Sequence, residues 1–196
     1  GCVPTDRTPR ADPGGRLPIT YPRRLEDTPA WPWYLPVDGV QRYGEGLLMG
    51  YRGFDASGVE PLLPFGHGLS YGTAEWGEAA VVSSTLTTGG DGEVVVEVPV
   101  RATGEHPATV VVQCYVCAPE SPVDRPPKWL GGFDKLLVAP GDETVARVRL
   151  GGEAFRRWDT ARGGWVVDPG RYEVVVARSA AAEAEHQRLA VDVAAG

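Results

Sequence analysis

Short runs of alternating apolar and polar residues, separated by turn signals, constrain the fold of this chain most strongly. Four valines occupy every second position of residues 93–101, and arginines alternate with apolar residues over 144–150. A period of two is typical of strands that bury one face and leave the other in water. Turns rich in Gly, Pro and Asp separate these runs. The segments predicted as strands are residues 78–88, 93–103, 108–118, 134–139, 143–150, 165–167, 171–178 and 187–194.

Residues 77–196 therefore have the pattern of an immunoglobulin-like β-sandwich, for which about seven strands spaced roughly 8–12 residues apart are typical. Residues 1–76 differ in character, because they are rich in turn residues and contain more than half of the 18 prolines. We predict a mainly β protein with two parts, a sandwich over residues 77–196 and an irregular, loop-rich segment over residues 1–76. Pro99 predicts an edge strand or a bulge, because proline has no N–H to donate to a ladder.

Length and charge exclude several classes of protein. A chain of 196 residues is too short for a complete (β/α)₈ barrel, which needs about 250 residues. The net charge of −7, without a basic stripe among the aromatics, argues against nucleic acid and anionic membranes as partners. No apolar run approaches the roughly 18 residues of a membrane-spanning helix. Because the first residues lack the pattern of a secretory leader, we expect the cytoplasm rather than secretion.

The three cysteines do not form a disulfide framework or a metal site. Cys114 and Cys117 have the spacing of a redox or zinc motif, but both lie in an apolar run predicted as a strand. Positions i and i+3 of a strand point to opposite faces, so the two sulfurs should diverge. A zinc site would also need a second Cys or His pair, which is absent. We predict free thiols, with neither a metal nor a cofactor.

Several longer sequence motifs occur in a fixed order along the chain. In the first part they are Gly14–Pro22, Leu25–Ala30, Tyr43–Arg52 and Glu60–Tyr71. In the second part they are Val112–Val116, Arg125–Phe133, Val138–Gly141, Trp158–Asp159 and Pro169–Val174. Together they closely resemble the C-terminal part of glycoside hydrolase family 3, the β-glucosidase family. The resemblance starts near residue 13, whereas residues 1–12 depart from the family pattern.

This resemblance implies the end of the family's α/β sandwich domain, followed by its fibronectin type III-like domain. Family members use two carboxyl groups, one on a catalytic barrel and one in the middle domain. Both lie upstream of the matched part, so no residue of this chain is expected to inherit either role. The resemblance implies a non-catalytic portion whose partner is the catalytic barrel domain or a separate catalytic chain. It also implies a large apolar surface on residues 15–76, where the family's other layers would pack.

Aromatic residues in the first part are candidates for binding. Trp31, Trp33 and Tyr34 lie in a Pro-rich loop, and they suit either packing against a neighbouring domain or stacking on a sugar. His67 lies between two glycines and is expected to lock the junction between the two parts, with a cleft-lining role as the alternative. Trp129 and the other sandwich aromatics, Phe133, Trp158 and Trp165, are expected to cap the core, although Trp129 is also a candidate for sugar contact.

Charged residues near Tyr43 form a second candidate group. Glu45 and Arg52 could pair across a hairpin as a structural clamp. The alternative is that Glu45 acts with Asp27 or Asp55 as a pair of catalytic carboxylates. Two further hypotheses stay open besides such autonomous hydrolysis: a stand-alone module that binds β-linked glycans, and an interaction protein that associates with itself or with another chain.

Overall fold

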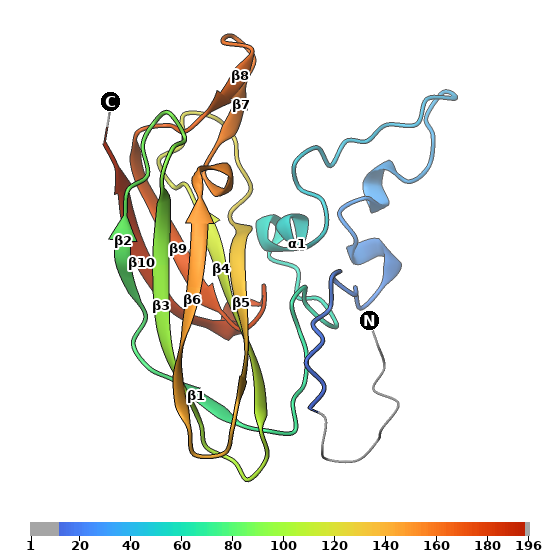
Figure 1. The fold of residues 1–196 in the computed structure, drawn as a ribbon. Helices are drawn as coiled ribbons and strands as arrows, with labels where there is room; N and C mark the ends of the chain where they lie inside the picture. Colours follow the sequence, from blue (N-terminus) through green and yellow to red (C-terminus); the bar gives the residue numbers. More distant parts are fainter. Residues whose placement is uncertain (1–11, 195–196) are drawn as a thin grey trace.

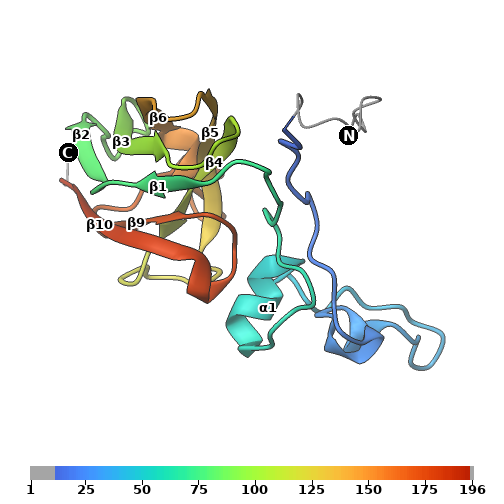
Figure 2. The same ribbon diagram turned by 90° about the horizontal axis from the view of Figure 1, so that it is seen from below.

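The computed structural model describes residues 12–194. Two antiparallel sheets pack face to face, and residues 12–73, here called the arm, run beside them (Figures 1 and 2). The first sheet contains β1 (Ala74–Trp76), β2 (Ala80–Ser84), β3 (Glu93–Ala102) and β6 (Glu143–Gly151). The second has the order β10-β9-β4-β5, from β4 (Ala108–Cys117), β5 (Trp129–Val138), β9 (Gly170–Ala177) and β10 (Glu185–Val193). The predicted mainly β sandwich is confirmed.

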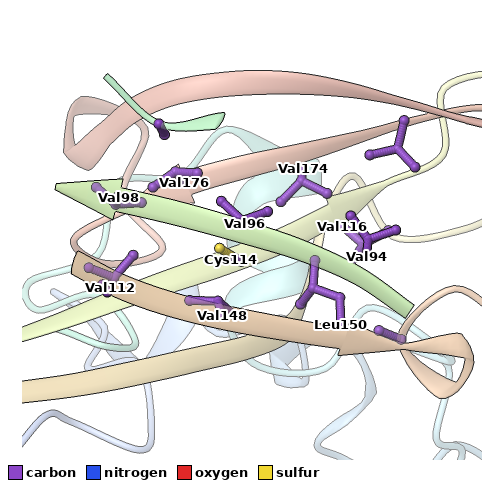
Figure 3. Packing of buried hydrophobic residues seen from close by; sticks show 14 of the residues in the cluster. Val94, Val96, Val98, Val112, Cys114, Val116, Val148, Leu150, Val174 and Val176 are labelled. Atoms are coloured by element: carbon purple, nitrogen blue, oxygen red, sulfur yellow. The ribbon is translucent and has the colours of Figure 1, made fainter. Parts of the chain in front are cut away.

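The core lies between the two sheets and consists mostly of valine. Alternate residues of β3 and β4 point into it, and β6 and β9 add side chains from their facing positions (Figure 3). Most of these side chains are completely removed from water. Each fully buried valine or leucine contributes roughly 1.5–3 kcal/mol before the entropy of ordering the chain is subtracted. The apolar residues that recur at every second position of the sequence are therefore the residues that face the core.

The strand predictions missed three short pieces of the sheets. These pieces are β1, the first half of β5, and β7 (Arg157–Asp159), which pairs only with β8 (Gly164–Val166) in a separate hairpin. Strands of three residues complete barely one alternation, so their pattern is too short to detect. Residues 129–133 contain two consecutive glycines, which interrupt the apolar pattern of β5.

The prediction of an edge strand or bulge at Pro99 was wrong. β3 lies inside its sheet, and Pro99 pairs in register with Val145 of β6. On the other side, the Gly77 N–H donates to the Pro99 carbonyl at 2.8 Å. Residues 77–79 separate β1 from β2. The proline nitrogen thus faces the gap between two short strands, where the ladder is already interrupted.

The arm contains little regular structure, as the sequence predicts. Its elements are η1 (Leu25–Asp27), η2 (Trp31–Trp33) and α1 (Tyr51–Ser57). Gly58 ends α1 in the left-handed conformation at φ +65°, which glycine adopts without strain. In the sandwich, η3 (Gly152–Ala154) follows β6, and η4 (Ala182–Ala184) lies in the connection between β9 and β10. No described helix is long and apolar enough to cross a membrane.

Cys114 and Cys117 point to opposite faces of β4, as predicted. Cys114 lies in the core between the sheets, whereas Cys117 belongs to a smaller cluster on the outer face. Both thiols are free, and burial raises the pKa of Cys114 to about 12 and that of Cys117 to about 11. They therefore stay protonated near neutral pH, which makes them poor nucleophiles and metal ligands. The remaining cysteine, Cys2, and the departure from the family pattern over residues 1–12 lie outside the described residues, except Asp12.

Candidate docking surface

An aromatic cluster joins the arm to the outer face of the second sheet. The ring of Tyr51 in α1 stacks on Phe65 at 4.8 Å and meets Tyr115 of β4 edge-on at 5.9 Å, both between ring centroids. The Leu130 N–H of β5 donates to the Tyr51 hydroxyl at 2.7 Å. Such aromatic pairs contribute about 0.5–1.5 kcal/mol beyond the area that they bury. One side of the arm is thus fixed on the sandwich.

Gln113 of β4 makes the central polar contact of this junction. Its Oε1 accepts from the Tyr115 hydroxyl at 2.6 Å, and its Nε2 donates to the carbonyls of Gly66 at 3.1 Å and Arg178 at 2.8 Å. Gly66 has φ +80°, and a Cβ there would lie 2.2 Å from Gln113 Oε1. Only glycine lets the arm approach this closely. Sequence reasoning missed Gln113, although a glutamine inside an apolar strand is a signal for a buried hydrogen bond.

Two carboxylates complete the junction. Asp12 accepts hydrogen bonds from the Ser70 hydroxyl and from the Tyr71 and Thr109 N–H groups, each at 2.6 Å. Burial opposes ionisation of Asp12, but these hydrogen bonds outweigh it and lower its pKa. Asp55 of α1 pairs with Lys128 at 2.9 Å, where both side chains are mostly buried. Burial raises the pKa of Asp55, and Lys128 only partly offsets this.

The other side of the arm is apolar and exposed. Within the described residues, 15 of the 22 large hydrophobic side chains that are exposed belong to the arm, although it is about a third of that length. Phe54 is the arm's only large hydrophobic among the buried residues described. Tyr43 is 87% exposed and Leu35 is 72% exposed. The large apolar surface predicted for this part therefore agrees with the concentration of exposed hydrophobic side chains in the arm.

The predicted aromatic residues lie on this exposed side. Trp31 in η2 and Tyr34 stack nearly parallel, with 6.1 Å between ring centroids and 11° between their planes. Trp33 lies against Gly44, where a Cβ would come within 2.2 Å of the indole ring. These aromatics and Tyr43 are all among the exposed hydrophobic residues of the arm.

The predicted charged residues do not come together as a pair. Among the described ion pairs none joins Glu45 to Arg52, whose guanidinium instead lies 5.9 Å from the centroid of the Tyr51 ring. Glu45 and Asp27 line the same groove of about 460 Å³. However, Asp27 caps η1 by accepting from the Arg24 backbone and guanidinium, each at 3.1 Å. Asp55 lines a different groove, so the three carboxylates form no common site.

His67 and Trp129 lie apart from the exposed aromatics. The imidazole of His67 lines a groove of about 600 Å³ between the arm and the loop at Arg178–Ala184. Trp129 is 9% exposed, and its indole N–H donates to the Ala154 carbonyl at 2.6 Å. Trp129 therefore caps the core, as expected.

The other sandwich aromatics do not cap the core, contrary to the sequence-based expectation. Trp158 and Trp165 are 51% and 57% exposed and pack edge-to-face at 5.5 Å across the β7–β8 hairpin. Phe133 on β5 is 62% exposed. In a strand, alternate positions face outward, and all three occupy such positions. No group of three or more His, Cys, Asp or Glu residues in the described chain is placed to bind a metal ion.

Comparisons with known proteins agree with this architecture. The fibronectin type III-like domain family matches residues 110–180. The probable β-glucosidase H of Aspergillus flavus is 38% identical over 86% of this chain and 20% of its own length. A β-glucosidase of Rhizobium radiobacter is 39% identical over 86% of this chain and 21% of its own length. The crystal structure of a GH3 β-glucosidase from Bifidobacterium adolescentis has a TM-score of 0.81 and 30% identity, covering 93% of this chain and 26% of that one.

The fold thus defines a fibronectin type III-like sandwich that carries an N-terminal arm. The chain matches the C-terminal portion of glycoside hydrolase family 3 β-glucosidases, as the sequence motifs indicate. It spans about a fifth of the length of the curated relatives that it matches.

Proposed function

We propose that this chain is a non-catalytic C-terminal portion of a family 3 β-glucosidase-like protein, which docks onto and stabilises the domains that hold the catalytic carboxylates. The exposed apolar side of the arm carries this proposal. Such a surface is unfavourable in water. Burying it against another domain would contribute about 25 cal/mol of stabilisation per Å² of apolar area. We also propose residues 1–76 as the remnant of the α/β domain with its linker, and residues 77–196 as the sandwich domain.

A chimera tests this proposal. Residues 12–194 would replace the matching segment of the Rhizobium radiobacter β-glucosidase, and turnover of an aryl β-glucoside would be measured. We expect the chimera to hydrolyse the glucoside and the isolated chain to show no turnover. A host enzyme with the segment deleted is the control. The proposal fails if the chimera yields no folded enzyme.

Autonomous hydrolysis by the arm is the competing outcome. If the isolated chain turned over the glucoside, and Glu45→Gln or Asp27→Asn abolished that turnover, the chain would have a catalytic pair of its own. A retaining glycosidase places its two carboxyl groups about 5–5.5 Å apart as nucleophile and acid/base. The hydrogen bonds of Asp27 with Arg24 instead give Asp27 a structural role as the cap of η1.

One observation favours binding of β-linked glycans as a second function. The nearly parallel rings of Trp31 and Tyr34 resemble a platform on which the C–H face of a sugar could stack. Titration with β-glucan oligosaccharides, followed by tryptophan fluorescence, would detect such binding. Saturable quenching that Trp31→Ala abolishes would support this function, whereas no response at millimolar oligosaccharide would exclude it.

A further inference from the structure

The outer face of β5 presents a second apolar surface next to the arm. Phe133, Lys135 and Leu137 point outward from this strand and are here called the β5 strip. Phe133 is 62% exposed and Leu137 is 71% exposed. Both are large apolar side chains, which are unfavourable on an exposed sheet face.

The outer face of the neighbouring strand, β4, is buried instead of exposed. Opposite the β5 strip, β4 presents Gln113, Val111 and Thr109 on the same outer face. Each of these three residues is at most 8% exposed, because the arm covers them. The arm thus covers these three β4 residues but leaves Phe133 and Leu137 of β5 exposed, although it contacts β5 at Leu130. Exposed apolar residues begin directly at the edge of the arm.

The arm and the β5 strip also meet directly. A Cβ on Gly14 would lie 2.9 Å from Lys135 Nζ, so this lysine lies along the arm. Lys135 is exposed and makes none of the ion pairs found among the described residues. A body that covers both surfaces would therefore meet apolar side chains around Lys135, an exposed lysine that forms no ion pair with the described residues.

We infer that the docking surface continues from the arm onto the β5 strip, so that one partner body covers both. This inference rests on the proposed function and commits to its partner, the domains that make up the remaining four fifths of the family 3 relatives. The chemistry of the strip calls for an apolar patch on that partner, with an acidic group opposite Lys135. Contact with the arm and with the sandwich would fix the partner relative to both parts of this chain.

Thiol labelling in the chimera described above tests the inference without placing a charge in the interface. Phe133→Cys and Leu137→Cys would be introduced separately, and labelling rates would be compared between the isolated chain and the chimera. We expect labelling to be roughly tenfold or more slower in the chimera. Val145→Cys is the matched control, because Val145 is 48% exposed on the outer face of the other sheet. Its rate should not change.

Substitutions with aspartate give a second readout. Phe133→Asp with Leu137→Asp should lower the melting temperature of the chimera but not of the isolated chain, where both side chains already lie in water. Leu35→Asp with Tyr43→Asp tests the arm in the same way.

Equal labelling in both proteins, with a melting temperature that responds only to the arm substitutions, would overturn the inference and leave the proposed function intact. If neither pair of aspartates affects the chimera, both the inference and the proposed function fail.

Discussion

At the scale of single residues, the junction between arm and sandwich depends on a few buried polar groups. Gln113 is 3% exposed and connects β4 to carbonyls that lie 47 and 65 residues away in sequence. A buried carbonyl without a donor costs about 1–3 kcal/mol. Removing the Gln113 side chain should therefore destabilise the protein by more than the net contribution of its hydrogen bonds to stability.

Replacing Gln113 by leucine tests this dependence. Gln113→Leu leaves two carbonyls and the Tyr115 hydroxyl without their partner, and we expect the free energy of unfolding to fall by about 2–4 kcal/mol. Tyr115→Phe removes only one hydroxyl and should cost about 1 kcal/mol. Urea unfolding would measure both. Equal losses for the two variants would contradict the central role given to Gln113.

Asp12 predicts a dependence of stability on pH. Its pKa in the folded protein is below the ordinary value of 3.8, so its stabilising effect is present above that value and is lost as pH falls through the lowered pKa. Asp12→Asn should therefore lower the free energy of unfolding by about 1 kcal/mol at pH 7, relative to the unsubstituted chain, and this loss should be smaller at pH 2, where protonation of Asp12 is favoured. Urea unfolding at the two pH values measures this difference. A constant difference would show that the charge of Asp12 is not involved.

At the scale of elements, hydrogen bonds from side chains to the backbone join the two sheets along the side where β10 lies next to β2. Gln187 of β10 accepts from the Ala79 N–H at 2.8 Å and donates to the Ala79 carbonyl at 2.9 Å. The amide therefore pairs with Ala79, just before β2, as another strand would. Beside it, His186 bonds to the Gly77 carbonyl at 2.8 Å and packs against Trp76. These contacts close one side of the sandwich.

This contact can be removed without changing the core. Gln187→Leu should lower the free energy of unfolding by about 1–2 kcal/mol, because both backbone groups of Ala79 lose their partner. Gln187→Glu keeps an acceptor for the N–H and should lose less. Amide hydrogen exchange of Ala79 would rise in the leucine variant. Unchanged exchange would contradict this prediction, because it would show that the Gln187 side chain does not protect the Ala79 N–H.

At the scale of the whole molecule, the sandwich has a sufficient core of its own, whereas the arm does not. The buried hydrophobic residues lie almost entirely in residues 79–193, with Phe54 as the exception. The arm therefore depends on contacts outside itself: on the sandwich on one side and, as proposed, on further domains on the other.

The exposed side of the arm should bind a hydrophobic dye such as ANS in the isolated chain. Leu35→Asp with Tyr43→Asp should reduce dye fluorescence while the melting temperature stays the same, because these side chains contact mostly water. Val82→Asp is the control, since Val82 is an exposed apolar residue that lies on β2, outside the arm. A large drop in melting temperature for the arm variant would show that this surface is packed within the chain itself.

The sequence by itself determined the sandwich, the opposite faces of Cys114 and Cys117, and the family resemblance. The alternation of apolar and polar residues and the family's sequence motifs are local properties of the chain. Only the tertiary structure decided that Pro99 fits an inner strand, that Phe133 and Trp158 face water, and that Gln113 joins the two parts. Period two assigns residues to faces but does not say which face another segment covers. That outcome depends on contacts between residues far apart in sequence, such as Asp12 with Thr109.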